Sequence, residues 1–140
     1  MLLKKIIKSC PNNISNYDIS GLSLDSRKVK KGDIFFSLEN KKNKYQNFIN
    51  EAIKKGAKVI VVSKKNKYKK SKIAIIKTDN IKKILAESCK IFFKKKPKNI
   101  IAVTGTNGKS SVADFFYQIL NVNKLPAASI GTLGIKKKKN

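Results

Sequence analysis

Short apolar runs that favour β-strands alternate along this chain with apolar stripes at helical spacing. The strand-like runs lie at 19–25, 34–38, 59–62, 73–76 and 99–103, and another opens at 127–130. The helical stripes lie at 2–10, 48–53, 79–93 and 112–120, and Asp79 is the expected N-terminal cap of the third. This alternation favours a parallel sheet with helices on its faces, because parallel strands need a crossover connection that a helix usually supplies. The predicted fold class is therefore α/β.

A lysine-rich break divides this pattern into two parts. The stretch Lys94–Lys98 interrupts both periodicities and is the best candidate linker. A chain of 140 residues has room for one small domain and the start of a second. We predict an N-terminal domain at 1–96 and an incomplete second domain at 97–140. Because half of a doubly wound sheet lacks the neighbouring strands and helices that would cover it, we expect apolar side chains at 98–140 to stay exposed to solvent.

The basic composition invites a nucleic-acid or anionic-membrane partner, since the formal net charge is +25. Of the 33 basic residues only Arg27 is an arginine. Proteins that recognise bases or bind phosphates usually use arginine, because its planar guanidinium group can donate two hydrogen bonds side by side. The lysines are scattered through every segment. We therefore predict no nucleic-acid partner, and a small basic nucleic-acid-binding protein stays as an alternative.

The cysteines and the start of the chain exclude several kinds of site and signal. Cys10 and Cys89 lie far apart in the sequence, which has no histidine, so the ligands of a Cys/His zinc site are missing. We expect both thiols to be buried in a reducing compartment. Lys4, Lys5 and Lys8 interrupt the first apolar residues before a signal-peptide core can form. No stretch approaches the roughly 20 apolar residues of a membrane span, so we predict a cytoplasmic protein without membrane insertion.

The strongest local signal is a glycine loop between a predicted strand and a predicted helix. Gly105 and Gly108 allow backbone amides to turn inward toward phosphate oxygens, and the positive end of the following helix adds to the attraction. Lys109 is placed to reach terminal phosphates, and the Ser110 hydroxyl is placed to bind magnesium. The predicted ATP-binding residues are Gly105, Thr106, Asn107, Gly108, Lys109, Ser110 and Ser111, with Lys109 catalytic and Ser110 the magnesium ligand.

This loop departs from the general phosphate-loop pattern, which asks for a glycine where Val103 stands. A plain strand-to-helix turn is the alternative, but such turns seldom need Gly-Lys-Ser at the helix start as well. The segment Thr104–Lys109 reads Thr-Gly-Thr-Asn-Gly-Lys and resembles the ATP loop of the Mur ligase family, which also includes folylpolyglutamate synthases. Asn107 together with Ile130–Gly134 is similar to the branch that adds the third residue of the muramoyl peptide.

A second stretch carries the same resemblance. Leu24–Arg27 followed by Gly32–Phe35 is similar to the start of the family's N-terminal domain, which holds the uridine diphosphate end of the substrate. Taken alone, Asp25–Arg27 reads as a polar turn after a strand. The substrate-binding residues that the resemblance implies are Leu24 and Ser26, and beside them Lys41, Lys42 and Asn43.

The resemblance implies an ATP-dependent amide-bond ligase of peptidoglycan precursor synthesis. Such ligases phosphorylate a substrate carboxylate with ATP, and the amine of the incoming amino acid, here diaminopimelate or lysine, attacks the acyl phosphate. The implied ligands are ATP, Mg²⁺ and UDP-N-acetylmuramoyl-L-alanyl-D-glutamate. The family's modified lysine, acidic magnesium ligand and third domain have no counterpart here, so we expect these 140 residues to be inactive alone. A stand-alone nucleotide-binding module is the alternative from a different class.

Overall fold

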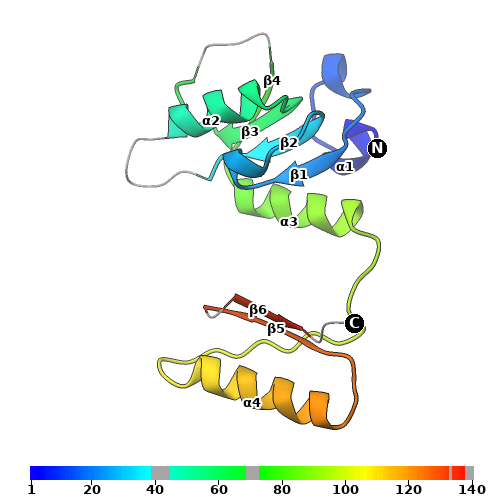
Figure 1. Cartoon of the computed structure of the whole chain (residues 1–140). Coiled ribbons are helices and arrows are strands. Elements are labelled where there is room, and N and C mark those ends of the chain that lie inside the picture. The colour runs from blue at the N-terminus through cyan, green and yellow to red at the C-terminus, as the bar shows by residue number, and fades with distance from the viewer. Residues whose placement is uncertain (39–44, 69–72, 133, 138–140) are drawn as a thin grey trace. The chain divides into compact units, whose positions relative to one another are not determined.

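The structure is a computed structural model that describes residues 1–38, 45–68, 73–132 and 134–137. The chain divides into two compact units, Met1–Lys96 and Pro97–Asn140. Figure 1 shows a four-stranded sheet with helices in the first unit, and a helix with a two-stranded hairpin in the second. Within the described ranges, no helix has the length and apolar character that crossing a membrane requires.

The first unit is built on a parallel sheet of four strands in sequential order. The strands are β1 (Gly21–Ser23), β2 (Asp33–Phe36), β3 (Val59–Ser63) and β4 (Ala74–Thr78). In the register Ile34 lies opposite Leu22 on one side and opposite Val59 on the other. Because all four strands run in one direction, their carboxyl ends lie at the same edge of the sheet. The predicted α/β class with a parallel sheet is confirmed.

Helices cover both faces of this sheet (Figure 1). They are α1 (Leu3–Ile6), α2 (Tyr45–Lys54) and α3 (Ile81–Phe92), with short 3-10 turns η1 (Asn12–Ile14) and η2 (Ser26–Lys28). Successive strand side chains point to opposite faces, so Phe36 and Val61 pack with α1 and α3, while Phe35 and Ile60 pack with α2. None of the four is more than 2% exposed. Each such burial is worth roughly 1.5–3 kcal/mol, which makes the two-sided sheet the stable part of the unit.

The N-terminal cap of α3 lies one residue later than the sequence predicts. The Asn80 side chain accepts a hydrogen bond from the backbone N–H of Lys83 at 2.9 Å, which satisfies one free amide of the first turn. The predicted cap, Asp79, instead accepts a hydrogen bond from the Lys64 ammonium at 2.5 Å. The prediction of Asp79 as the cap is therefore wrong, because the carboxylate is used to tie the helix start to the β3–β4 connection.

The first helix and the two cysteines also differ from expectation. Helix α1 is only four residues long, because Ile7 leaves the helical region at φ −121° and ψ 100°. Cys10 and Cys89 are half-buried rather than buried. Burial raises the pKa of the Cys89 thiol, so this side chain favours its neutral form.

The second unit holds helix α4 (Lys109–Val122) and an antiparallel hairpin of β5 (Ala128–Gly131) and β6 (Gly134–Lys137). The helix and β5 confirm the elements predicted at 112–120 and 127–130. Neither β6 nor antiparallel pairing in this unit is predicted from the sequence. The lysines of β6 give it no apolar strand pattern, and it pairs with β5 through its backbone.

The buried strand predicted at 99–103 is wrong. The structure assigns no strand there, and Ile100 is 80% exposed. A strand needs a neighbour to take up its N–H and C=O groups. In the described part of this unit β5 pairs with β6, so the apolar run has a suitable composition but no partner strand.

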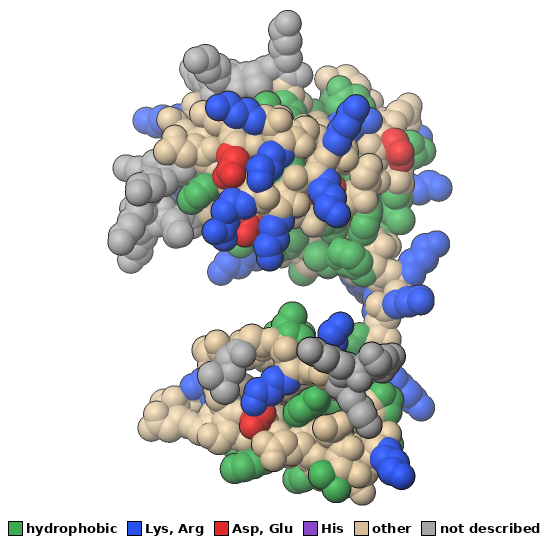
Figure 2. Space-filling model, viewed as in Figure 1, with side chains coloured by type: hydrophobic (Ala, Val, Ile, Leu, Met, Phe, Trp, Pro, Cys, Tyr) green, Lys and Arg blue, Asp and Glu red, His purple; other side chains and the backbone are tan. Residues whose placement is uncertain are grey.

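Apolar side chains on α4 stay exposed, as expected for this unit. Phe115, Ile119 and Val122 are between 58% and 81% exposed. Figure 2 shows hydrophobic side chains on the surface of the unit that contains α4. An apolar surface of this kind is typical of a face that packs against another surface, and it contributes little to the stability of the unit itself.

Candidate functional site

The predicted phosphate loop forms a series of bends between residue 104 and α4. Gly108 is the N-cap of α4 and adopts a left-handed backbone with φ 76°. Gly105 also has a positive φ, at 146°. Among the described residues, nothing lies within 4 Å of a Cβ placed on Gly108, so the left-handed backbone, and not crowding, calls for glycine there.

The Lys109 side chain folds back over this loop. Its ammonium donates hydrogen bonds to the carbonyl oxygens of Gly105 at 2.6 Å and Thr106 at 2.8 Å. A positive charge therefore sits over the loop at the amino end of a 14-residue helix, where the helix dipole also favours an anion. The whole stretch 105–111 is exposed, so a ligand has direct access from solvent.

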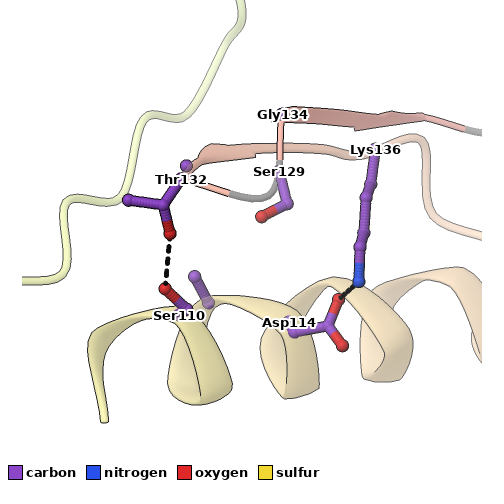
Figure 3. A pocket seen from close by; sticks show the side chains of 8 residues that line it. Ser110, Asp114, Ser129, Thr132, Gly134 and Lys136 are labelled. Carbon is purple, nitrogen blue, oxygen red and sulfur yellow. Dashed lines mark hydrogen bonds and ion pairs between the residues drawn. The ribbon is translucent and has the colours of Figure 1, made fainter. Parts of the chain in front are cut away.

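Two contacts join the start of α4 to the hairpin (Figure 3). The Ser110 hydroxyl lies 3.2 Å from the Thr132 hydroxyl, and the Lys136 ammonium donates to Asp114 at 2.5 Å. Hydrogen bonds from Lys136 and then Gln118 lower the pKa of Asp114, which therefore stays charged. The hollow between these side chains has a volume of about 20 Å³. It has room for about one water molecule, which makes it too small to hold a nucleotide.

A larger hollow of about 500 Å³ lies in the first unit. It opens where β1 and β2 end, which is the edge at which open α/β sheets usually bind ligands. The lining residues are Leu24, Asp25, Ser26, Arg27, Phe35, Ser37, Leu38, Phe48 and Glu51. Leu24 is half exposed, at 52%, whereas Ser26 is only 4% exposed. The hollow thus combines an apolar rim with a buried hydroxyl.

Charged side chains hold the turn beside this hollow. The Arg27 side chain donates two hydrogen bonds to the Asp25 carboxylate, both at 2.9 Å. These bonds, followed by one from the Arg27 backbone N–H, lower the pKa of Asp25 to about 2. The Ser26 hydroxyl donates to Glu51 on α2 at 2.5 Å. The turn is therefore fixed both within itself and against the neighbouring helix.

Sequence comparison decides the family. Residues 18–110 match the Mur ligase family, catalytic domain, which covers about two thirds of this chain and reaches from before β1 into the glycine loop. The chain belongs to the Mur ligase family.

The curated relatives are longer members of this family. The chain is 40% identical over 121 residues to the UDP-N-acetylmuramoyl-L-alanyl-D-glutamate–2,6-diaminopimelate ligase of Rickettsia prowazekii, and this match covers 86% of the chain and 25% of that protein. The ligase of the same name from Mesorhizobium japonicum is 37% identical over 121 residues, with 86% and 25% covered. The chain thus spans about a quarter of the length of the relatives it matches.

Solved Mur ligase structures share the fold. A UDP-N-acetylmuramoyl-L-alanyl-D-glutamate–2,6-diaminopimelate ligase structure matches with a TM-score of 0.73 and 24% identity, covering 100% of this chain and 29% of that one. The MurF ligase from Thermotoga maritima in complex with ADP matches with a TM-score of 0.56 and 24% identity, covering 76% and 24%. At this identity the likeness concerns the fold.

In this Mur ligase chain the structure gathers some of the predicted site residues. Leu24 and Ser26 line one hollow, and the predicted ATP-binding residues 105–111 form the loop and first turn of α4. The predicted substrate residues Lys41, Lys42 and Asn43 lie outside the described residues.

The fold brings to these places four side chains that are not predicted from the sequence. Glu51 and Phe48 line the hollow, and Asp114 and Lys136 tie α4 to the hairpin. The sequence does contain a signal for Phe48 and Glu51. Residues three apart on a helix share a face, so the two side chains could have been expected to lie together. For Asp114 and Lys136 the sequence offers no comparable signal, since their pairing depends on an unpredicted strand.

Proposed function

We propose that this chain carries the nucleotide-binding parts of an ATP-dependent ligase that adds an amino acid to UDP-N-acetylmuramoyl-L-alanyl-D-glutamate. The observation that carries the proposal is the glycine loop with the Lys109 ammonium over it, at the start of α4. The names of the curated relatives favour diaminopimelate over lysine as the amino acid. The expected reaction is formation of an amide bond through an acyl phosphate.

ATP is the proposed ligand of the loop at 105–111. The carbonyl oxygens that accept from Lys109 lie within its own loop. A phosphate oxygen can therefore replace them as the hydrogen-bond acceptor of the ammonium without a large rearrangement. Backbone amides at the start of α4 and the helix dipole add attraction for an anion. That a related fold binds ADP, as the MurF structure does, supports the same role here.

Mg²⁺ is the proposed companion of ATP, with Ser110 as the protein ligand. Within the described ranges, no group of three His, Cys, Asp or Glu side chains could hold a metal ion by itself. A single exposed hydroxyl fits Mg²⁺ bound to a nucleotide, because this ion commonly takes most of its oxygen ligands from phosphates and water. When bound, the ion neutralises charge on the phosphates.

The hollow of the first unit is the proposed site for the uridine diphosphate end of the substrate. Its volume of about 500 Å³ lies within the range of small-molecule pockets. Leu24 offers an apolar surface for a base, and Ser26 offers a buried polar atom. We propose Lys41, Lys42 and Asn43 as further contacts, since they follow the strand end at which the hollow opens.

In the proposed reaction this chain positions substrates and neutralises charge. The γ-phosphoryl group passes to a substrate carboxylate, and phosphate leaves when the amine attacks the acyl carbon. Lys109 and the loop amides would stabilise the negative charge on the phosphate oxygens during the first step, which is the main task of a protein in phosphoryl transfer.

Calorimetric titration of the purified chain with ATP in the presence of Mg²⁺ tests this proposal. We expect binding that the Lys109→Met variant weakens at least about tenfold, because it removes a charge-assisted contact worth roughly 1.5–3 kcal/mol. Lys82→Met, which removes the same charge from an exposed position on α3, is the matched control and should bind as the unchanged chain does. Equal ATP affinity for all three proteins would refute the role of the loop.

A further inference from the structure

A buried hydroxyl and a carboxylate share the wall of the hollow in the first unit. Ser26 follows β1 and is 4% exposed, and Glu51 lies on α2, 25 residues further along the chain. The hydroxyl oxygen and Oε2 of the carboxylate are 2.5 Å apart, with the serine as donor. Both residues line the hollow, so this hydrogen bond is made within the candidate ligand site.

The direction of this hydrogen bond determines what Ser26 can offer a ligand. A hydroxyl has one hydrogen and two lone pairs, and an ionised carboxylate can only accept. Since the single hydrogen of Ser26 points to Glu51, only lone pairs remain for other partners. A ligand atom that reaches Ser26 Oγ must therefore be a hydrogen-bond donor, which excludes a phosphate oxygen.

The carboxylate of Glu51 is held in place by its surroundings. Its neighbours Ile49 and Ala52 are fully buried against the sheet, which fixes this turn of α2. The second carboxylate oxygen, Oε1, lies 3.8 Å from the Lys55 ammonium. That ammonium in turn donates to the backbone carbonyl of Arg27 in the turn beside the hollow. The two carboxylate oxygens thus have different partners, and Oε2 remains directed at Ser26.

We propose that Glu51 fixes Ser26 as a hydrogen-bond acceptor and thereby selects uracil over cytosine in this hollow. The inference rests on the proposed binding of a uridine diphosphate group there. Uracil carries a hydrogen on its N3 atom, whereas cytosine presents a bare lone pair at N3. A uracil N3–H can donate to Ser26, but a cytosine N3 would face the Ser26 oxygen lone pair to lone pair. Glu51 is a positioning residue in this scheme, and Ser26 makes the contact.

The test compares binding of UDP and CDP to the 140-residue chain by calorimetry. The unchanged chain should bind UDP at least about tenfold more tightly than CDP, since an unsatisfied polar group in a buried site costs about that much. Glu51→Gln retains size but can donate as well as accept, so Ser26 is no longer held as an acceptor and the preference should fall to about threefold or less. Ser26→Ala should remove the preference mainly by weakening UDP binding.

Two controls make the comparison specific. Glu87→Gln makes the same charge change at an exposed position on α3 and should keep the full preference. N3-methyl-UDP, which lacks the N3 hydrogen, should bind the unchanged chain at least about tenfold more weakly than UDP. This second control changes only the ligand, so it does not depend on the folding of a variant.

Three results would overturn the inference, and they separate it from the function on which it rests. If UDP binds and Glu51→Gln keeps the full preference over CDP, the role of Glu51 is wrong while the uridine site stands. If Ser26→Ala weakens UDP and CDP equally, Ser26 faces the ribose or the phosphates instead of the base. If the unchanged chain binds neither nucleotide, the uridine site and the inference fail together.

Discussion

Two glycines with left-handed backbones should respond differently to the same substitution. Gly56 ends the α2 segment with φ 92°, and a Cβ placed on it lies 3.1 Å from the Lys31 Cα and 3.3 Å from the Lys31 Cβ. Gly108 has φ 76°, and among the described residues nothing lies within 4 Å of its Cβ position. Both variants to alanine carry the strain of a left-handed backbone, about 1–2 kcal/mol. Only Gly56→Ala adds overpacking, which costs about 1–3 kcal/mol more.

Amide hydrogen exchange can measure the two effects separately, because it reports opening free energies segment by segment. Gly56→Ala should lower the opening free energy of the β3 amides by about 2–5 kcal/mol. Gly56 precedes β3, and its new Cβ crowds Lys31 in the turn before β2, the strand that pairs with β3. Gly108→Ala should lower protection only in the first turns of α4, by about 1–2 kcal/mol. Equal losses in β3 for both variants, or a smaller loss for Gly56→Ala, would refute this account of the two turns.

Three further substitutions test individual contacts. Arg27→Gln should raise the pKa of Asp25 from about 2 toward 3.8, as read by carboxyl NMR; because the folded-state pKa is the lower one, the stability from this pair is complete above pH 3.8 and is lost as pH falls toward 2. Asp114→Asn should raise amide exchange in β5 only slightly, because its partner Lys136 is partly exposed and such a surface pair contributes little. Ile60→Ala should cost about 2–5 kcal/mol in urea unfolding, since its side chain is fully buried.

The sequence predicts the first unit well because local pattern and burial agree there. The run at 59–62 is apolar throughout, and in the structure β3 is buried on both faces of a parallel sheet. The helix at 79–93 appears as α3, with its boundaries changed by one or two residues at each end. Asn80, and not Asp79, caps this helix because Asp79 accepts a hydrogen bond from Lys64. The position of Lys64 depends on the fold and cannot be read from the local sequence pattern.

The second unit and the hollow depend on contacts that a local pattern does not specify. The run at 99–103 has the composition of a buried strand, but pairing requires a neighbour, and β5 pairs with β6 instead. The sequence points to Ser26 through a family motif and to the helix that carries Glu51 through its apolar stripe. Their hydrogen bond joins residues far apart in the chain, so only the fold reveals it.

We propose that the backbone from Gly105 to Ser111 binds the phosphates of ATP. Amide NMR spectra of the isotopically labelled chain, recorded with increasing ATP and Mg²⁺, test it most directly. We expect the largest shifts at the amides of 105–111, and the Lys109→Met variant should require at least about tenfold more ATP for the same shifts. Loop amides that stay unchanged at saturating ATP, while signals elsewhere move, would contradict the claim.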